Sequence, residues 1–240
     1  MPFTFSHPAI ILPFAKVKHL SLSMSALVIG SLTPDFEYFV KMKLSGRYGH
    51  SLEGMFVLDL PMAIGIALIF HQIVKRPLID SLPVYFNTRL QSLRNFDFPG
   101  YITRHPIAFS VCLLIGIGSH LLWDSFTHAN SYFVDNIAFL STPIAIDGLP
   151  QVPFFRYLQH LSTAVGAIFI FWFFHHLPVC SNASTLGLKF WVIVFSVAIV
   201  SFAIRSYFSF EYFGDLVTSV ISSGLIGIIV ASLFTRLSHG

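Results

Sequence analysis

Five long runs of apolar residues constrain this chain more than any other feature of its sequence. They fall near residues 54–74, 107–127, 157–177, 189–207 and 214–235. A helix needs about 20 such residues to cross a bilayer. Because a backbone inside hydrocarbon must satisfy its own hydrogen bonds, these runs predict helices. We therefore expect an all-α fold, a polytopic integral membrane bundle with about five spans.

The composition agrees with a membrane protein. Charged residues make up 10% of the 240 positions, whereas soluble domains carry about 25%. The mean hydropathy is +0.74. The net charge is only +3, and the basic residues form no stripe, so nucleic acid is not an expected partner. The lipid bilayer is the partner we expect, and the sequence leaves the oligomeric state open.

We expect one domain over residues 1–240. Residues 1–53 would form an N-terminal site segment, 54–177 three core spans with their loops, and 189–235 two packing spans. The apolar stretch 20–32 is too short to cross alone and predicts a buried or re-entrant helix that ends at Pro34.

Two connecting segments differ in character. Residues 75–106 mix basic and aromatic side chains and predict a segment lying at the membrane interface. Residues 129–156 are rich in Pro, Asn and Asp and predict a loop with short turns.

The second apolar run carries three ionisable residues at four-residue spacing, His120, Asp124 and His128. Four residues rotate only about 40° around a helix, so these side chains share one face. An ionisable residue within a span is costly and indicates a functional site. Imidazole and carboxylate are ligands that zinc, manganese or iron would accept.

Counting the spans brings other polar residues to the same side of the membrane. If 20–32 does not cross, the N-terminal region lies on the side where the second run ends and the third begins. The polar residues on that side come from five segments: His7, Asp35, Glu37, His50, Glu53, His120, Asp124, His128 and His160. This set is large enough for one to three divalent ions, zinc before manganese or iron. The 14 Lys and Arg residues divide equally between the two sides, so they do not orient the protein.

Six of these residues also have a purely structural interpretation. Asp35 follows Pro34 and could cap a helix, while Glu53 suits the start of a helix dipole. His120 and Asp124 could form a hydrogen bond between helices. His128 could lie at the interface, and His160 could make a polar helix contact.

The residues Ser6-His7-Pro8, Pro34-Asp35-x-Glu37, Gly49-His50-Ser51 and Ser119-His120-x-x-x-Asp124 resemble a known pattern. It is that of the membrane-bound, metal-dependent hydrolases that include LexA-regulated inner-membrane proteins. The opening Met-Pro-Phe-Thr-x-Ser-His-Pro, with Trp-Asp-Ser-Phe-Thr-His, resembles more closely the membrane family called domain of unknown function 4184. Both are similar, more distantly, to zinc-dependent phospholipase C and the P1-type nucleases.

The resemblance implies a set of metal ligands and two further candidates for catalytic roles. The implied ligands are His7, Asp35, His50, His120 and Asp124, with His160 as an addition. His128 would be a further ligand or a catalytic residue. Glu37 stands where the hydrolases have Asp and is the second catalytic candidate. The N-terminal Trp ligand of phospholipase C and P1 nuclease has no counterpart here, because six residues precede His7.

We therefore expect a multi-pass protein of the cell inner membrane that hydrolyses a phosphoester, such as a lipid phosphate, with a metal-activated water. Two alternatives remain open at this point. One is a transporter or ion-handling protein with a His/Asp relay. The other is a non-catalytic scaffold whose metal is structural and fully enclosed by protein ligands.

Overall fold

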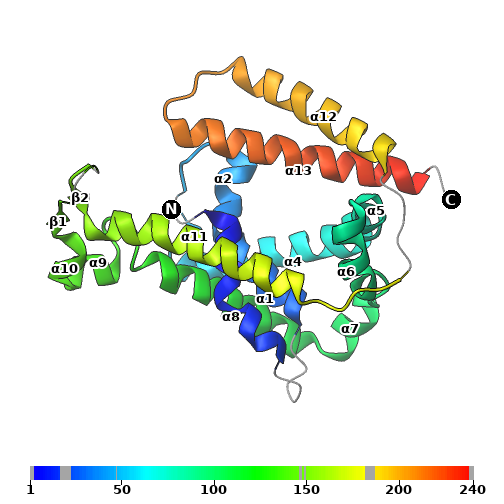
Figure 1. The fold of residues 1–240 in the computed structure, drawn as a ribbon, viewed down its shortest axis with the longest axis horizontal. Helices are drawn as coiled ribbons and strands as arrows, with labels where there is room; N and C mark the ends of the chain where they lie inside the picture. Colours follow the sequence, from blue (N-terminus) through cyan, green and yellow to red (C-terminus); the bar gives the residue numbers. More distant parts are fainter. Residues whose placement is uncertain are drawn as a thin grey trace. The chain divides into compact units, whose positions relative to one another are not determined.

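The structure is a computed structural model that describes residues 3–16, 23–46, 48–145, 148, 150–181 and 187–237. Helices account for nearly all regular structure in these residues (Figure 1). In the first part of the chain the elements are η1 (Thr4–Ile10), η2 (Leu12–Lys16), α1 (Met24–Leu32), η3 (Thr33–Asp35), α2 (Phe36–Lys41), α3 (Leu52–Gly54), η4 (Met55–Asp59), α4 (Leu60–Ile69), η5 (Phe70–Val74) and α5 (Lys75–Ser81). They continue with α6 (Val84–Arg94), α7 (Phe98–Arg104), α8 (Pro106–Asp124), α9 (Tyr132–Asn136), α10 (Ala138–Ser141), β1 (Pro143–Ile144), β2 (Val152–Pro153), α11 (Phe154–His175), α12 (Leu188–Ser206) and α13 (Phe213–Leu237).

Among the described residues, five helices are long and apolar enough to cross a membrane, which confirms the predicted all-α bundle. They are Leu52–Ser81, Pro106–Asp124, Phe154–His175, Leu188–Ser206 and Phe213–Leu237. The first is longer than expected, because the helix continues through Lys75 and Arg76 to Ser81. Pro77 lies inside this continuous helix, where it removes one backbone N–H donor.

The first span contains two π-helical turns, η4 and η5. Such turns widen the helix locally and are frequent at functional sites. Each contains one buried ionisable residue, Asp59 in η4 and His71 in η5. The two turns therefore occur where the span carries polar groups inside the protein.

Both connecting segments contain more regular structure than expected. The range 75–106 folds into α5, α6 and α7, with Pro83 preceding α6 and residues 95–97 separating α6 from α7. The range 129–156 forms α9, α10 and a two-stranded antiparallel ribbon in which Ile144 pairs with Val152. Val134, Leu140 and Phe155 form a small hydrophobic core there. That packing stabilises helical turns in a segment whose Pro and Asn content favours loops.

The chain divides into two compact units: one of residues 1–34, 48–63 and 105–174, the other of 35–47, 64–104 and 175–240. In the first unit, α1 packs against α8 through glycines. A Cβ on Gly30 would collide with the Leu113 carbonyl, and one on Gly116 with the Leu27 carbonyl. Only glycine allows the two backbones to come this close. The short helix expected over 20–32 is observed as α1 from Met24, with Ala26, Leu27 and Ile29 buried; residues 20–22 are outside the described residues.

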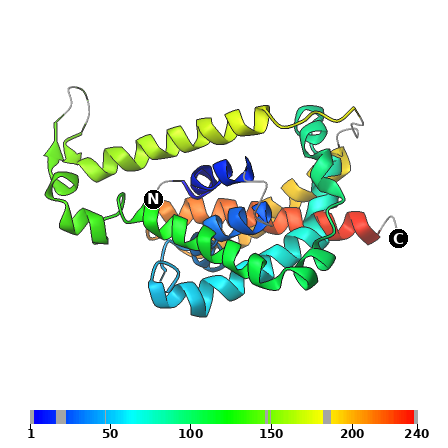
Figure 2. The same ribbon diagram turned by 90° about the horizontal axis from the view of Figure 1, so that it is seen from below.

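The N-terminal 3-10 helix η1 lies along α11 in the same unit (Figure 2). Ser6 Oγ donates to the Thr163 carbonyl over 3.1 Å, and the Phe3 N–H donates to Thr163 Oγ1 over 3.0 Å. Gly166 faces Ser6 without a side chain between them. These contacts fix the segment that carries His7.

In the second unit, α12 and α13 form an antiparallel pair (Figure 1). Gly227 lies against the Val194 backbone, where a Cβ would collide. Gly224, by contrast, has open space around its Cβ position. Buried Asp215 accepts backbone hydrogen bonds from Leu44, Glu211 and Tyr212. The last span is thus tied to the 42–46 turn by a carboxylate rather than by apolar contact alone.

Candidate metal centre

The close crossing of α1 and α8 positions His120. One helical turn beyond Gly116, the His120 imidazole lies fully buried, and its Nδ1 is 2.8 Å from the Ser31 carbonyl oxygen. A carbonyl oxygen only accepts, so Nδ1 carries the proton and donates. The lone pair is then on Nε2. A backbone carbonyl that fixes the tautomer in this way is typical of metal-binding histidines.

Asp124, the last residue of α8, lies at the centre of four imidazoles. Its Oδ2 is 3.3 Å from His120 Nε2 and 3.4 Å from His50 Nε2. Its Oδ1 is 3.5 Å from His7 Nε2 and 3.4 Å from His128 Nδ1. All five residues belong to the first unit. The structure thus brings these five side chains together around one carboxylate.

The three separations to the Nε2 atoms of His7, His50 and His120 suit shared coordination better than direct hydrogen bonds. Optimal N–H···O⁻ contacts are about 2.7–2.9 Å long. Two ligands of one tetrahedral zinc, each about 2.0–2.1 Å from the ion, lie about 3.3 Å apart. Neither buried carboxylate oxygen of Asp124 accepts a hydrogen bond from any described residue. The residues present thus fit a divalent ion, and His50, His120 and Asp124 form one group with suitable ligand atoms within 4.8 Å of one another.

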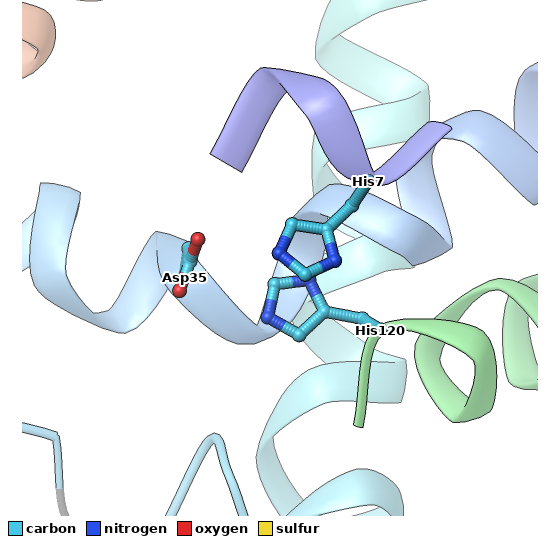
Figure 3. Close-up of side chains that lie close together, drawn as sticks. All are labelled: His7, Asp35 and His120. Carbon is cyan, nitrogen blue, oxygen red and sulfur yellow. The ribbon is translucent and has the colours of Figure 1, made fainter. Parts of the chain in front are cut away.

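A second group contains His7, Asp35 and His120, again with ligand atoms within 4.8 Å (Figure 3). The His7 and His120 rings are stacked, with centroids 3.8 Å apart. Asp35 is the final residue of η3, directly bonded to Pro34 of the first unit, and is fully buried. Its side chain makes no capping hydrogen bond to α2, which removes the interpretation of Asp35 as a helix cap.

His50 is held by a capped helix start. Ser51 Oγ accepts from the Gly54 N–H over 2.9 Å and donates to the Tyr48 carbonyl over 2.8 Å. This cap begins α3 and leaves His50 just before the span. The His50 side chain is 26% exposed, whereas those of His7 and His120 are 0% exposed. The cluster is therefore accessible from the His50 side.

His128 lies beyond the end of α8 and is also oriented by the backbone. Its Nδ1 donates to the Asp124 carbonyl oxygen over 3.1 Å, which leaves the lone pair on buried Nε2. Burial lowers the pKa of this imidazole below its ordinary value, although the Asp124 carboxylate opposes the shift. His128 is therefore neutral near pH 7 and able to accept a proton or bind a metal.

Three of the predicted site residues are not members of either group: His128, which lies beside Asp124, and also Glu37 and His160. Glu37 is buried in the second unit, and its Oε1 pairs with Lys41 Nζ at 2.5 Å. His160 is exposed on the first third of α11. Within the described residues, neither is a member of the two candidate ligand groups. Glu53, the structural candidate, is exposed at the start of α3.

The sequence did not reveal the groups that support the ligands. These are the Ser31 carbonyl, the Gly30–Gly116 crossing and Trp123, whose ring meets the His7 ring edge-on with centroids 5.5 Å apart. Gly116, four residues before His120, was the available signal, since small residues mark close helix crossings. A backbone carbonyl leaves no signal in a sequence.

Comparison with known proteins identifies a family and nothing more specific. A family model described as Domain of unknown function (DUF4184) matches residues 1–233. No curated protein and no solved structure matches the chain.

Proposed function

We propose that this chain, which belongs to the DUF4184 family, is a membrane-bound, metal-dependent hydrolase of a phosphoester. The observation that carries the proposal is the position of Asp124 within 3.3–3.5 Å of four imidazole nitrogens. Three nitrogen and oxygen ligands with room for a water are what a catalytic zinc requires. Zinc is the metal we expect first, and manganese or iron would accept the same donors.

The chain's own residues divide into holding and orienting groups. We assign His50, His120 and Asp124 to the principal ion, with His7 and Asp35 available to a second. The Ser31 and Asp124 carbonyls keep the Nε2 atoms of His120 and His128 in their lone-pair form. A bound divalent ion would lower the pKa of a water and offset charge on a phosphoryl oxygen. We assign to His128, which lies beside Asp124, the role of accepting a proton from that water.

The location of the cluster favours a lipid phosphate as substrate. Asp124 ends the second span, and His50 precedes the first span, which begins at Leu52. The ligands therefore lie at helix ends, where a span meets the headgroup region. A lipid could present its phosphate there while its acyl chains stay in the bilayer. We propose the cell inner membrane as its location, with the chain as a multi-pass protein.

Metal content is the first test, measured by elemental mass spectrometry on detergent-purified protein made without chelator. We expect one or more equivalents of zinc, manganese or iron in the wild type and none in His120→Ala/Asp124→Ala. The matched control is His105→Ala/His176→Ala, which removes two exposed imidazoles outside both ligand groups. Metal-free wild type, or equal loss in the control, would contradict the metal centre.

Activity is the second test. Phosphate release from a short-chain phosphatidic acid should require added metal and fall by at least about 10²-fold in Asp124→Asn, since the charge that holds the ion is lost. Circular dichroism must show that the variant is folded. Metal bound by the wild type without hydrolysis of lipid or chromogenic phosphoesters would reject the enzyme and leave a structural metal.

A further inference from the structure

A polar pocket lies in the second unit and is lined by residues of η5 and α5, of the segment after α6, of the start of α7 and of the end of α13. Its volume is about 300 Å³. Three cations line it, Lys75, Arg76 and Arg236, together with one carboxylate, Asp97. These four side chains give the lining a net charge of +2. None of them belongs to the metal centre.

Lys75 is the most unusual of these residues, because it is 96% buried (4% exposed) and has no carboxylate partner among the described residues. Its ammonium donates to the Phe96 carbonyl over 3.1 Å and lies 5.4 Å from the centre of the Phe96 ring. An ammonium has three donors, and the carbonyl uses one. A buried cation without a counter-charge is costly. An anion in the pocket would remove that cost.

The remaining charges are arranged to receive an anion. Arg76 and Arg236 are exposed, come from different helices, and form no ion pair with any described carboxylate. The one acidic group, Asp97, is engaged elsewhere. Its Oδ2 lies 3.6 Å from Arg104 Nη2, and its Oδ1 accepts the Gly100 N–H over 3.1 Å. The negative charge is thus partly neutralised, while three positive charges face the pocket.

An apolar groove of about 550 Å³ begins at the other end of α5. It is lined by Leu82, Pro83, Phe86, Leu188, Trp191 and Phe195. A seven-residue helix such as α5 is about 10 Å long. A charged pocket and an apolar groove at the two ends of so short a helix match the two parts of a phospholipid. Inorganic phosphate would use only the first.

We propose that this basic pocket binds the phosphate of an anionic phospholipid, with the acyl chain lying in the adjacent groove. Lys75 provides the buried charge, and Arg76 and Arg236 close on the phosphate from two helices. Basic pockets between membrane helices bind anionic headgroups in this way. The pocket shares no residue with the proposed hydrolytic centre, so the lipid bound here is a structural or regulatory ligand rather than the substrate.

The test uses the full chain, delipidated in a neutral detergent, with binding followed by native mass spectrometry. Short-chain phosphatidylglycerol should bind one per chain, at least about tenfold more tightly than phosphatidylcholine with the same acyl chains. Arg76→Gln/Arg236→Gln should lose about tenfold or more in affinity, because each basic residue near a lipid phosphate contributes appreciably. The matched control, Arg156→Gln/Lys189→Gln, removes two exposed charges outside the pocket and should bind normally.

Using exposed arginines avoids dependence on a Lys75 variant that fails to fold. A separate experiment measures how well inorganic phosphate competes with phosphatidylglycerol for the pocket. Weak competition supports a lipid ligand, whereas phosphate that binds as tightly as phosphatidylglycerol overturns it. Equal loss in both double variants, or no preference for phosphatidylglycerol, overturns the pocket. Asp124→Asn should bind the lipid as the wild type does, which keeps this result independent of the metal centre.

Discussion

His120 Nδ1 donates to the Ser31 carbonyl across 2.8 Å, and this contact joins α8 to α1 at the candidate metal centre. It depends on the crossing of Gly30 and Gly116 nearby. The packing of α1 against α8 therefore determines how the His120 imidazole is oriented. A change in the crossing should therefore alter the orientation of the His120 imidazole.

Gly116→Ala should destabilise the protein by about 1–3 kcal/mol, because its methyl group would collide with the Leu27 carbonyl. It should also lower metal occupancy by displacing His120. Gly65→Ala is the matched control, since nothing lies within 4 Å of its Cβ position. Thermal unfolding in detergent and metal content measure the two effects. A stable Gly116→Ala with normal occupancy would separate the crossing from the site.

The two remaining histidine candidates should behave differently. His128→Ala should weaken metal retention by about tenfold or more, as loss of a group bonded to a ligand residue commonly does. His160→Ala should retain metal normally, because His160 is exposed on α11. Titration of the loaded protein with a chelator gives both affinities. Equal weakening in the two variants would return His160 to the ligand set.

Gly227→Ala should weaken the α12–α13 pair by about 1–3 kcal/mol, because the Val194 backbone leaves no room for a methyl group. Gly224→Ala, three residues earlier on the same helix, meets open space. It should be neutral or slightly stabilising, since alanine favours helices. Unfolding temperatures in one detergent compare the pair directly, and a larger loss in Gly224→Ala would contradict this packing.

Asp215→Ala should cost about 1–3 kcal/mol, because three backbone N–H groups would lose their acceptor. Glu211→Ala removes a neighbouring carboxylate whose partner is Lys43 on the exposed surface. Such an exposed pair contributes only about 0–1 kcal/mol. In denaturant unfolding, Asp215→Ala should therefore have a clearly lower free energy of unfolding than Glu211→Ala. A reversed order would show that the hydrogen bonds to Asp215 do not stabilise the protein.

The long apolar runs predicted all five candidate spans, because hydrophobic length is a local property of sequence. The spacing of His120 and Asp124 likewise predicted a shared helix face. The continuation of the first span to Ser81 and the helices of 129–156 depend on tertiary packing that composition does not encode. The same holds for Lys75, which the sequence suggested at an interface and the fold buries.

The π turn η5 has a consequence for counting along the first span. A π turn fits one extra residue into the helix, so the side chains after it are rotated by about 100° relative to an unbroken α-helix. Helix α5 begins with Lys75, directly after that turn. Deleting one residue from η5 would leave a span of ample length, yet it would turn Lys75 away from Phe96. The rotation of this helix about its own axis, rather than its hydrophobicity, therefore determines whether the Lys75 ammonium is buried in the protein or exposed to lipid.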